Sequence, residues 1–110
     1  MKDMAALKSR YQRDDPAIRL GGLASNMARI GWFIEHGSPA SLGNLFRESK
    51  YFVEWVAQDS SSDIQVILAE LQLQLAIWER RWSSGQSMTL IVPEAQRWSQ
   101  ELLARSGLVD

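Results

Sequence analysis

The segment from Asp63 to Trp82 constrains the fold most, because as a helix it is apolar on two sides. At 100° per residue, one side collects large apolar residues at spacings of three and four, namely Ile64, Ile67, Leu68, Leu71, Leu75, Trp78 and Trp82. The opposite side carries Val66, Leu73 and Ile77. Such a helix must bury both faces, so we expect it at the centre of a bundle or with one face against a second chain.

Signals at both ends predict that this helix spans residues 62–84. Ser62 followed by Gln65 fits a capping box, in which each side chain bonds a free backbone N–H of the other residue. Gly85 suits the left-handed position that often follows a helix C-terminus.

The length and composition of the chain exclude several classes of protein. A chain of 110 residues has the size of one domain with one core. It has no cysteine, which excludes disulfides, thiolate metal sites and cysteine nucleophiles. The net charge of -1 supplies no overall field that would attract nucleic acid. No apolar run has the length of a signal peptide or a membrane span, so we expect a cytoplasmic protein without a nucleic-acid or membrane partner.

Residues 1–14 predict a short helical extension, because Met4, Leu7 and Tyr11 recur at helical spacing. Basic residues surround this stripe: Lys2, Lys8, Arg10 and Arg13. They fit an arm for an acidic partner, but a solvated extension is the simpler interpretation.

The first long helix is predicted over residues 15–36, with Asp15 as its cap and Pro16 in its first turn. Small residues form a stripe along it: Gly21, Ala24, Ala28 and Gly31. Each glycine in a helix costs about 1 kcal/mol relative to alanine. We therefore expect a neighbouring helix to approach this stripe closely.

The second helix is predicted over residues 39–58, after a cap at Ser38. On its outer side Arg47, Tyr51 and Trp55 recur every four residues. These residue types are common interface anchors, which favours a surface for a partner. Packing against the N-terminal segment or the last helix explains them as well, and both alternatives stay open.

The last helix is predicted over residues 92–106, with Pro93 in its first turn and Gly107 after its end. The short connections make consecutive helices antiparallel neighbours. The sequence therefore predicts an all-α fold, a single domain over residues 1–110 with a four-helix bundle over 15–107.

Three stretches carry a resemblance: DPAIRLGGLASNMARI, VEWVA and Leu71-Gln-Leu-Gln-Leu75. With them, most of residues 11–107 resembles small all-helical cyanobacterial proteins of unassigned function. The resemblance implies a helical fold and a cytosolic bacterial setting. It implies no catalytic or binding residue.

The residues present do not predict catalysis, a metal site or a cofactor. The single histidine, His36, is expected at a helix end on the surface. Neither glycines nor serines form a phosphate loop or an activated nucleophile. Five tryptophans are many for this length, and three lie on apolar faces: Trp78, Trp82 and Trp98. They fit core packing, or a flat ligand stacked between them.

We therefore expect a non-enzymatic interaction protein that self-associates, and a possible protein partner. The interface candidates are Val66, Leu73, Ile77, Arg47, Tyr51 and Trp55. An isologous dimer would place Leu73 near its two-fold axis. The alternative is a binding module for an apolar or aromatic small molecule. Nucleic-acid binding through Arg19 and the basic N-terminal residues is the weakest hypothesis, because of the net charge.

Overall fold

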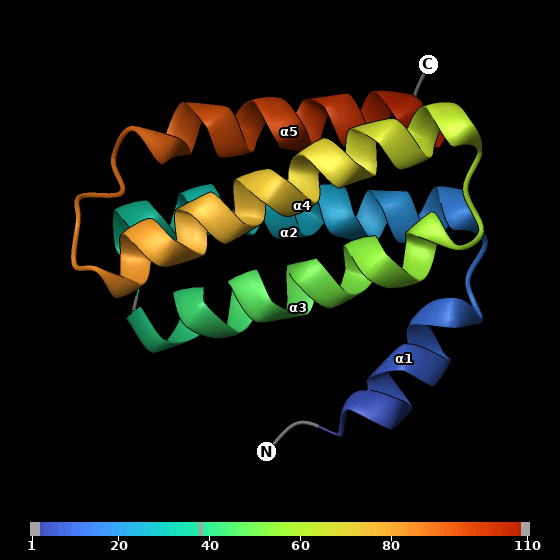
Figure 1. The fold of residues 1–110 in the computed structure, drawn as a ribbon, viewed down its shortest axis with the longest axis horizontal. Helices are drawn as coiled ribbons and strands as arrows, with labels where there is room; N and C mark the ends of the chain where they lie inside the picture. Colours follow the sequence, from blue (N-terminus) through green and yellow to red (C-terminus); the bar gives the residue numbers. More distant parts are fainter. Residues whose placement is uncertain (1–2, 38, 109–110) are drawn as a thin grey trace.

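The computed structural model describes residues 3–37 and 39–108, and within them it is all helical, without a strand. Figure 1 shows the order of the helices, which are α1 Met4–Gln12, α2 Pro16–His36, α3 Pro39–Ala57, α4 Ser62–Ser83 and α5 Ile91–Ser106. The predicted all-α class is confirmed. The predicted cap at Ser38 and the basic residue Lys2 lie outside the described residues.

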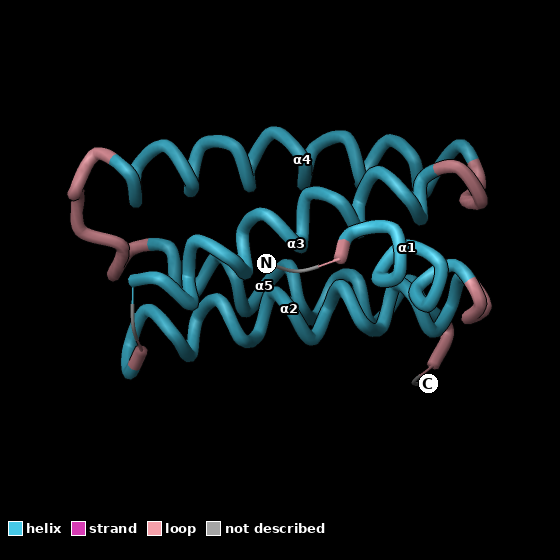
Figure 2. Tube along the Cα trace, turned by 90° about the horizontal axis from the view of Figure 1, so that it is seen from below, coloured by secondary structure: helices cyan, strands magenta, loops and turns pink. Residues whose placement is uncertain are grey.

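The four long helices run side by side, and the contacts between them are unequal (Figure 1). The closest pair is α2 with α5, followed by α2 with α3 and α3 with α4. Helices α4 and α5 come close at few positions, and α1 packs mainly on α3. As a result α4 runs along one edge of the molecule, as Figure 2 shows. The arrangement is compatible with the expected four-helix bundle.

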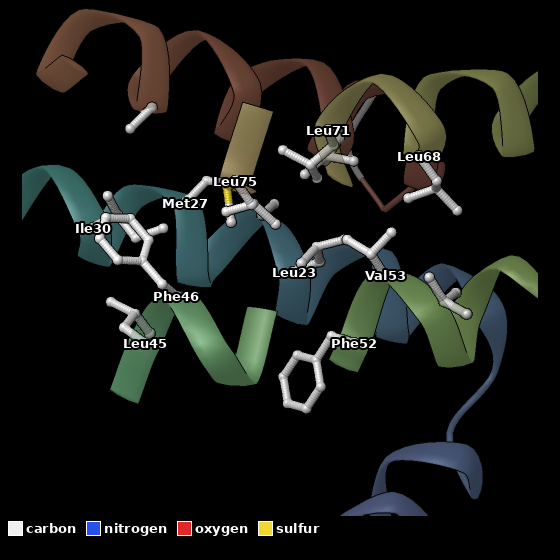
Figure 3. Close-up of a cluster of buried hydrophobic side chains, with 14 of the residues drawn as sticks. Leu23, Met27, Ile30, Leu45, Phe46, Phe52, Val53, Leu68, Leu71 and Leu75 are labelled. Atoms are coloured by element: carbon white, nitrogen blue, oxygen red, sulfur yellow. The ribbon is translucent and has the colours of Figure 1, made fainter. Parts of the chain in front are cut away.

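The core is built from the inner faces of the long helices (Figure 3). Its fully buried residues include Leu23, Met27, Ile30, Phe46, Val56, Leu68, Leu71, Leu75, Trp78 and Leu102. One polar pair lies among them, because the Asn26 amide donates to the Ser49 hydroxyl at 3.2 Å. The predicted inner stripe of α4 therefore lies where its periodicity places it.

The cap of α4 differs from the prediction by one residue. Ser61 is the N-cap, and its hydroxyl accepts from the backbone N–H of Ile64. Gln65 does not return to Ser62 but donates to the Ala57 carbonyl at 2.8 Å. The predicted capping box is wrong because Ser61, not Ser62, caps the helix, which puts Gln65 one position beyond the residue that could bond back to the cap. The left-handed glycines are confirmed, with φ of 76° at Gly85 and 78° at Gly107.

The small residues of α2 face α5 only in part. Gly31 is buried, and a Cβ built on it would lie 3.7 Å from the Val92 side chain. Ala24 is buried, whereas Ala28 is exposed. Ala28 does not belong to the close contact, because it lies about 40° beyond Ala24 around the helix, outside the edge of the buried face. The expectation of close approach along the whole stripe is wrong at that position.

A second close approach was not predicted. A Cβ on Gly43 of α3 would lie 2.6 Å from the ring of Trp82 on α4. The glycine therefore makes room for an indole where α3 meets α4. A single glycine in a helical pattern does not reveal which side chain will lie over it.

Candidate interaction surface

The outer face of α4 is apolar and uncovered. Val66 is 60% exposed, Leu73 65% and Ile77 50%, although each is a large aliphatic residue. Ala69 and Ala76 are exposed between them. No described part of the chain packs over these residues, so the second apolar stripe of the helix is not core within one chain.

The spacing of this face matches that of a helix seam. Val66, Ala69, Leu73 and Ala76 follow one another at intervals of three, four and three. Large and small side chains alternate along the seam, which suits close packing of a second helix. We call these four residues with Ile77 the α4 outer face.

A groove of about 570 Å³ runs beside this face, between α3 and α4. Its lining includes Arg47 and Tyr51 of α3 together with Ala76 of α4. Lys50 and Glu79 form an ion pair between the two helices. The structure thus places two of the three outer candidates of α3 next to the α4 outer face, which the sequence could not show.

Trp55 lies elsewhere, because α1 covers it. The side chain is 5% exposed and lies 6.0 Å, ring to ring, from Tyr11. Tyr11 also stacks on Phe52 with the ring centroids 4.0 Å apart. The placement removes Trp55 from the exposed interface candidates, since α1 folds back across α3 and buries it. Tyr51 is half-buried beside it and Arg47 is exposed.

The N-terminal segment is therefore a docked helix, not a solvated extension. Leu7 and Tyr11 are both buried, and the Tyr11 hydroxyl donates to the Arg19 carbonyl at 2.9 Å. Burial raises the pKa of the Tyr11 hydroxyl well above its usual range, and the nearby Arg19 charge opposes this in part. The helical spacing of Leu7 and Tyr11 therefore predicted the packing of this segment better than its basic residues did.

Arg19 is not available to nucleic acid. It is 3% exposed and donates from Nη2 to Asp59 Oδ2 at 2.9 Å. Its Nε and Nη1 are buried without a hydrogen-bond partner. Arg19 is thus enclosed in the protein. The other residues of the predicted basic site, Lys8, Arg10 and Arg13, are exposed on the N-terminal segment.

The three tryptophans on apolar faces do not converge on one ligand. Trp78 is fully buried, and its indole N–H donates to Glu94 Oε2 at 3.2 Å. Trp82 packs on Phe46 between α3 and α4, with ring centroids 6.2 Å apart. Trp98 lines a separate cleft between α4 and α5. A flat ligand stacked between all three has no site here.

His36 is exposed at the end of α2, as predicted. Its ring stacks on Trp32 with centroids 4.7 Å apart, and Nδ1 lies 3.0 Å from the Trp32 carbonyl. Within residues 3–37 and 39–108 no group of three or more His, Asp or Glu side chains could hold a metal ion. In the same residues no helix is long and apolar enough to cross a membrane.

Comparison with models of known protein families, with curated proteins and with solved structures found no match. The case for a function therefore depends on the surface itself.

Proposed function

We propose that this chain is a non-enzymatic interaction protein, a four-helix bundle with an N-terminal helix, that self-associates through the α4 outer face. The observation that supports this most is the row Val66, Leu73 and Ile77, three exposed aliphatic residues in a line on one helix. Single exposed apolar residues are normal, but a contiguous row of them marks a contact site.

A second copy is the occupant that the spacing and the charges favour. In an antiparallel pair of α4 helices centred on Leu73, Ile77 of one copy faces Ala69 of the other, so both backbones can approach. The exposed Asp63 lies at one end of α4 and the exposed Arg80 at the other. An antiparallel pair brings Asp63 of one copy near Arg80 of its partner, whereas a parallel pair sets like charges side by side.

This geometry is isologous, because the same face serves both copies. Leu73 lies in the middle of α4 and so comes near the two-fold axis. The groove beside the face brings Arg47 and Tyr51 to the edge of the same contact. These two residues then form the rim and Leu73 the centre.

The test is sedimentation of the purified chain over a range of concentrations. We expect a dimer for the parent, and a folded monomer for Leu73→Glu, because like charges would face each other near the axis. Ile18→Glu is the matched control, since Ile18 is also an exposed aliphatic residue on a helix, at 49%, and lies on α2. That variant should stay dimeric.

Two results would contradict the proposal. The first is a parent chain that is monomeric at every concentration while Leu73→Glu unfolds it, which would make the face internal core. The second is a control variant that dissociates as readily as Leu73→Glu, which would make the association nonspecific.

A further inference from the structure

Helices α4 and α5 come close to each other at few positions, and a cleft of about 360 Å³ lies between them. This volume lies at the lower end of the range of small-molecule sites. Ile67 and Glu70 line it from α4, and Glu94, Trp98 and Glu101 line it from α5. Neither wall belongs to the α4 outer face, so the cleft is a separate site from the proposed dimer contact.

One wall of the cleft is anchored to the core. The fully buried Trp78 crosses from α4 towards α5, where its indole N–H donates to Glu94 Oε2. This bond holds the Glu94 carboxylate at the cleft wall. A negative charge therefore has a defined position between α4 and α5, whose backbones come close at few positions.

The cleft combines negative charge with apolar surface. Its lining carries three carboxylates and one guanidinium, that of Arg97. Arg105 bonds one oxygen of Glu101 at 2.8 Å from the next helical turn. Trp98 and Ile67 are half-buried and form the apolar part of the lining. An indole face attracts cations, so the apolar and the acidic parts favour the same kind of ligand.

The positions of the carboxylates favour an extended ligand over a metal ion. Within the described residues the acidic side chains form no group that could hold a metal. Glu94 and Glu101 are seven residues apart, which corresponds to about 10 Å along the helix axis. Trp98 lies between them on the same side of α5. Carboxylates thus lie at both ends of the α5 wall, with the Trp98 ring and the Arg97 guanidinium between them.

We propose that this cleft binds a linear aliphatic amine with two or more protonated amino groups. The amino groups pair with the carboxylates of Glu94 and Glu101, and the methylene chain lies against Trp98. Glu70 adds a third carboxylate from α4. The proposal does not depend on self-association.

Isothermal titration of the full chain with spermidine in 150 mM salt tests this. We expect saturable binding of one spermidine per chain, with Trp98→Leu about tenfold weaker. Glu101→Gln lies on an exposed position and should fold normally, and we expect it to weaken binding about threefold. Glu54→Gln is the matched control, because Glu54 is an exposed carboxylate in the groove between α3 and α4. Its affinity should equal that of the parent.

The proposal is overturned if spermidine shows no saturable binding, or if Glu54→Gln weakens it as much as Glu101→Gln does. Equal competition by Mg²⁺ at the same concentration would also overturn it, because the attraction would then be diffuse. Sedimentation of the parent chain separates this outcome from a failure of the dimer, since Glu101 and Trp98 lie on α5.

Discussion

The outer faces of α3 and α4 differ in what covers them. Each helix carries a second set of large apolar residues opposite the first. On α3 this set is Tyr51 and Trp55, and Tyr11 of α1 lies against the buried Trp55. On α4 it is the row around Leu73, over which no described residue packs. A second apolar face therefore shows that a cover is needed, but not whether the cover comes from the same chain.

The outer face of α3 is covered and that of α4 is not because the N-terminal helix lies near α3. Residues 4–12 are the one helical segment outside the four long helices, and nine residues span only about 13 Å. The segment leads directly into α2 and reaches the end of α3 that lies nearby (Figure 1). It reaches one outer face and leaves the other uncovered.

Truncating a large side chain to alanine should have very different effects on stability at the covered face and at the uncovered one, and this is the largest effect we expect. We expect Trp55→Ala to lower the free energy of unfolding by about 3–5 kcal/mol, because it opens a cavity under α1. Leu73→Ala in the dilute monomer should change it by less than about 0.5 kcal/mol. Urea unfolding at low protein concentration measures both.

Trp32→Ala is the control for losing an indole, since Trp32 is 55% exposed. An equal loss for Trp32→Ala and Trp55→Ala would show that the contact of α1 with α3 does not contribute to stability.

Two glycines report how closely neighbouring helices approach, Gly43 where α3 meets α4 and Gly31 where α2 meets α5. Gly43→Ala should destabilise by about 1–3 kcal/mol, because the new Cβ would lie 2.6 Å from the Trp82 ring. Gly31→Ala should stabilise by up to about 1 kcal/mol, because its Cβ would make an ordinary contact with Val92 and improve helix propensity. Thermal unfolding compares the two variants directly. A rise in melting temperature for Gly43→Ala would show that α3 does not approach the α4 indole as closely as described.

The smallest effect concerns the attachment of α1. Tyr11→Phe should cost about 0.5–1.5 kcal/mol at neutral pH, because the hydrogen bond to the Arg19 carbonyl is lost. Tyr51→Phe is the control, since Tyr51 belongs to the same aromatic group and its hydroxyl bonds no group among the described residues. The unfolding free energy in urea at pH 7 distinguishes them, and an equal loss in both would contradict the role of this bond.

The same residue predicts a dependence on pH. Burial raises the pKa of folded Tyr11 above the ordinary value of 10.0, so the unfolded chain loses this proton first. The stability that the neutral hydroxyl contributes is complete below pH 10 and is lost as the pH rises above it. Tyr11→Phe should therefore flatten the fall in stability between about pH 9.5 and 11.

Local signals were sufficient for the helices. Predicted boundaries at residues 15–36, 39–58, 62–84 and 92–106 agree with the structure to within one residue at every end. The reason is that periodicity, prolines in first turns and left-handed glycines act within a few residues of each other. The inner stripe of α4 was predictable for the same reason.

Contacts between distant residues were not recoverable. The sequence contained the second faces of α3 and α4, and left open for α3 whether a partner or the N-terminal segment covers it. Only the tertiary structure places Tyr11 on Phe52 and leaves Leu73 bare. The tertiary structure also shows that Arg19 is buried and Ala28 exposed. It places the three tryptophans at separate sites and leaves a cleft between α4 and α5. Which helix lies over which face depends on how far each connection reaches and how all the faces fill space together, and no short stretch of sequence carries that information.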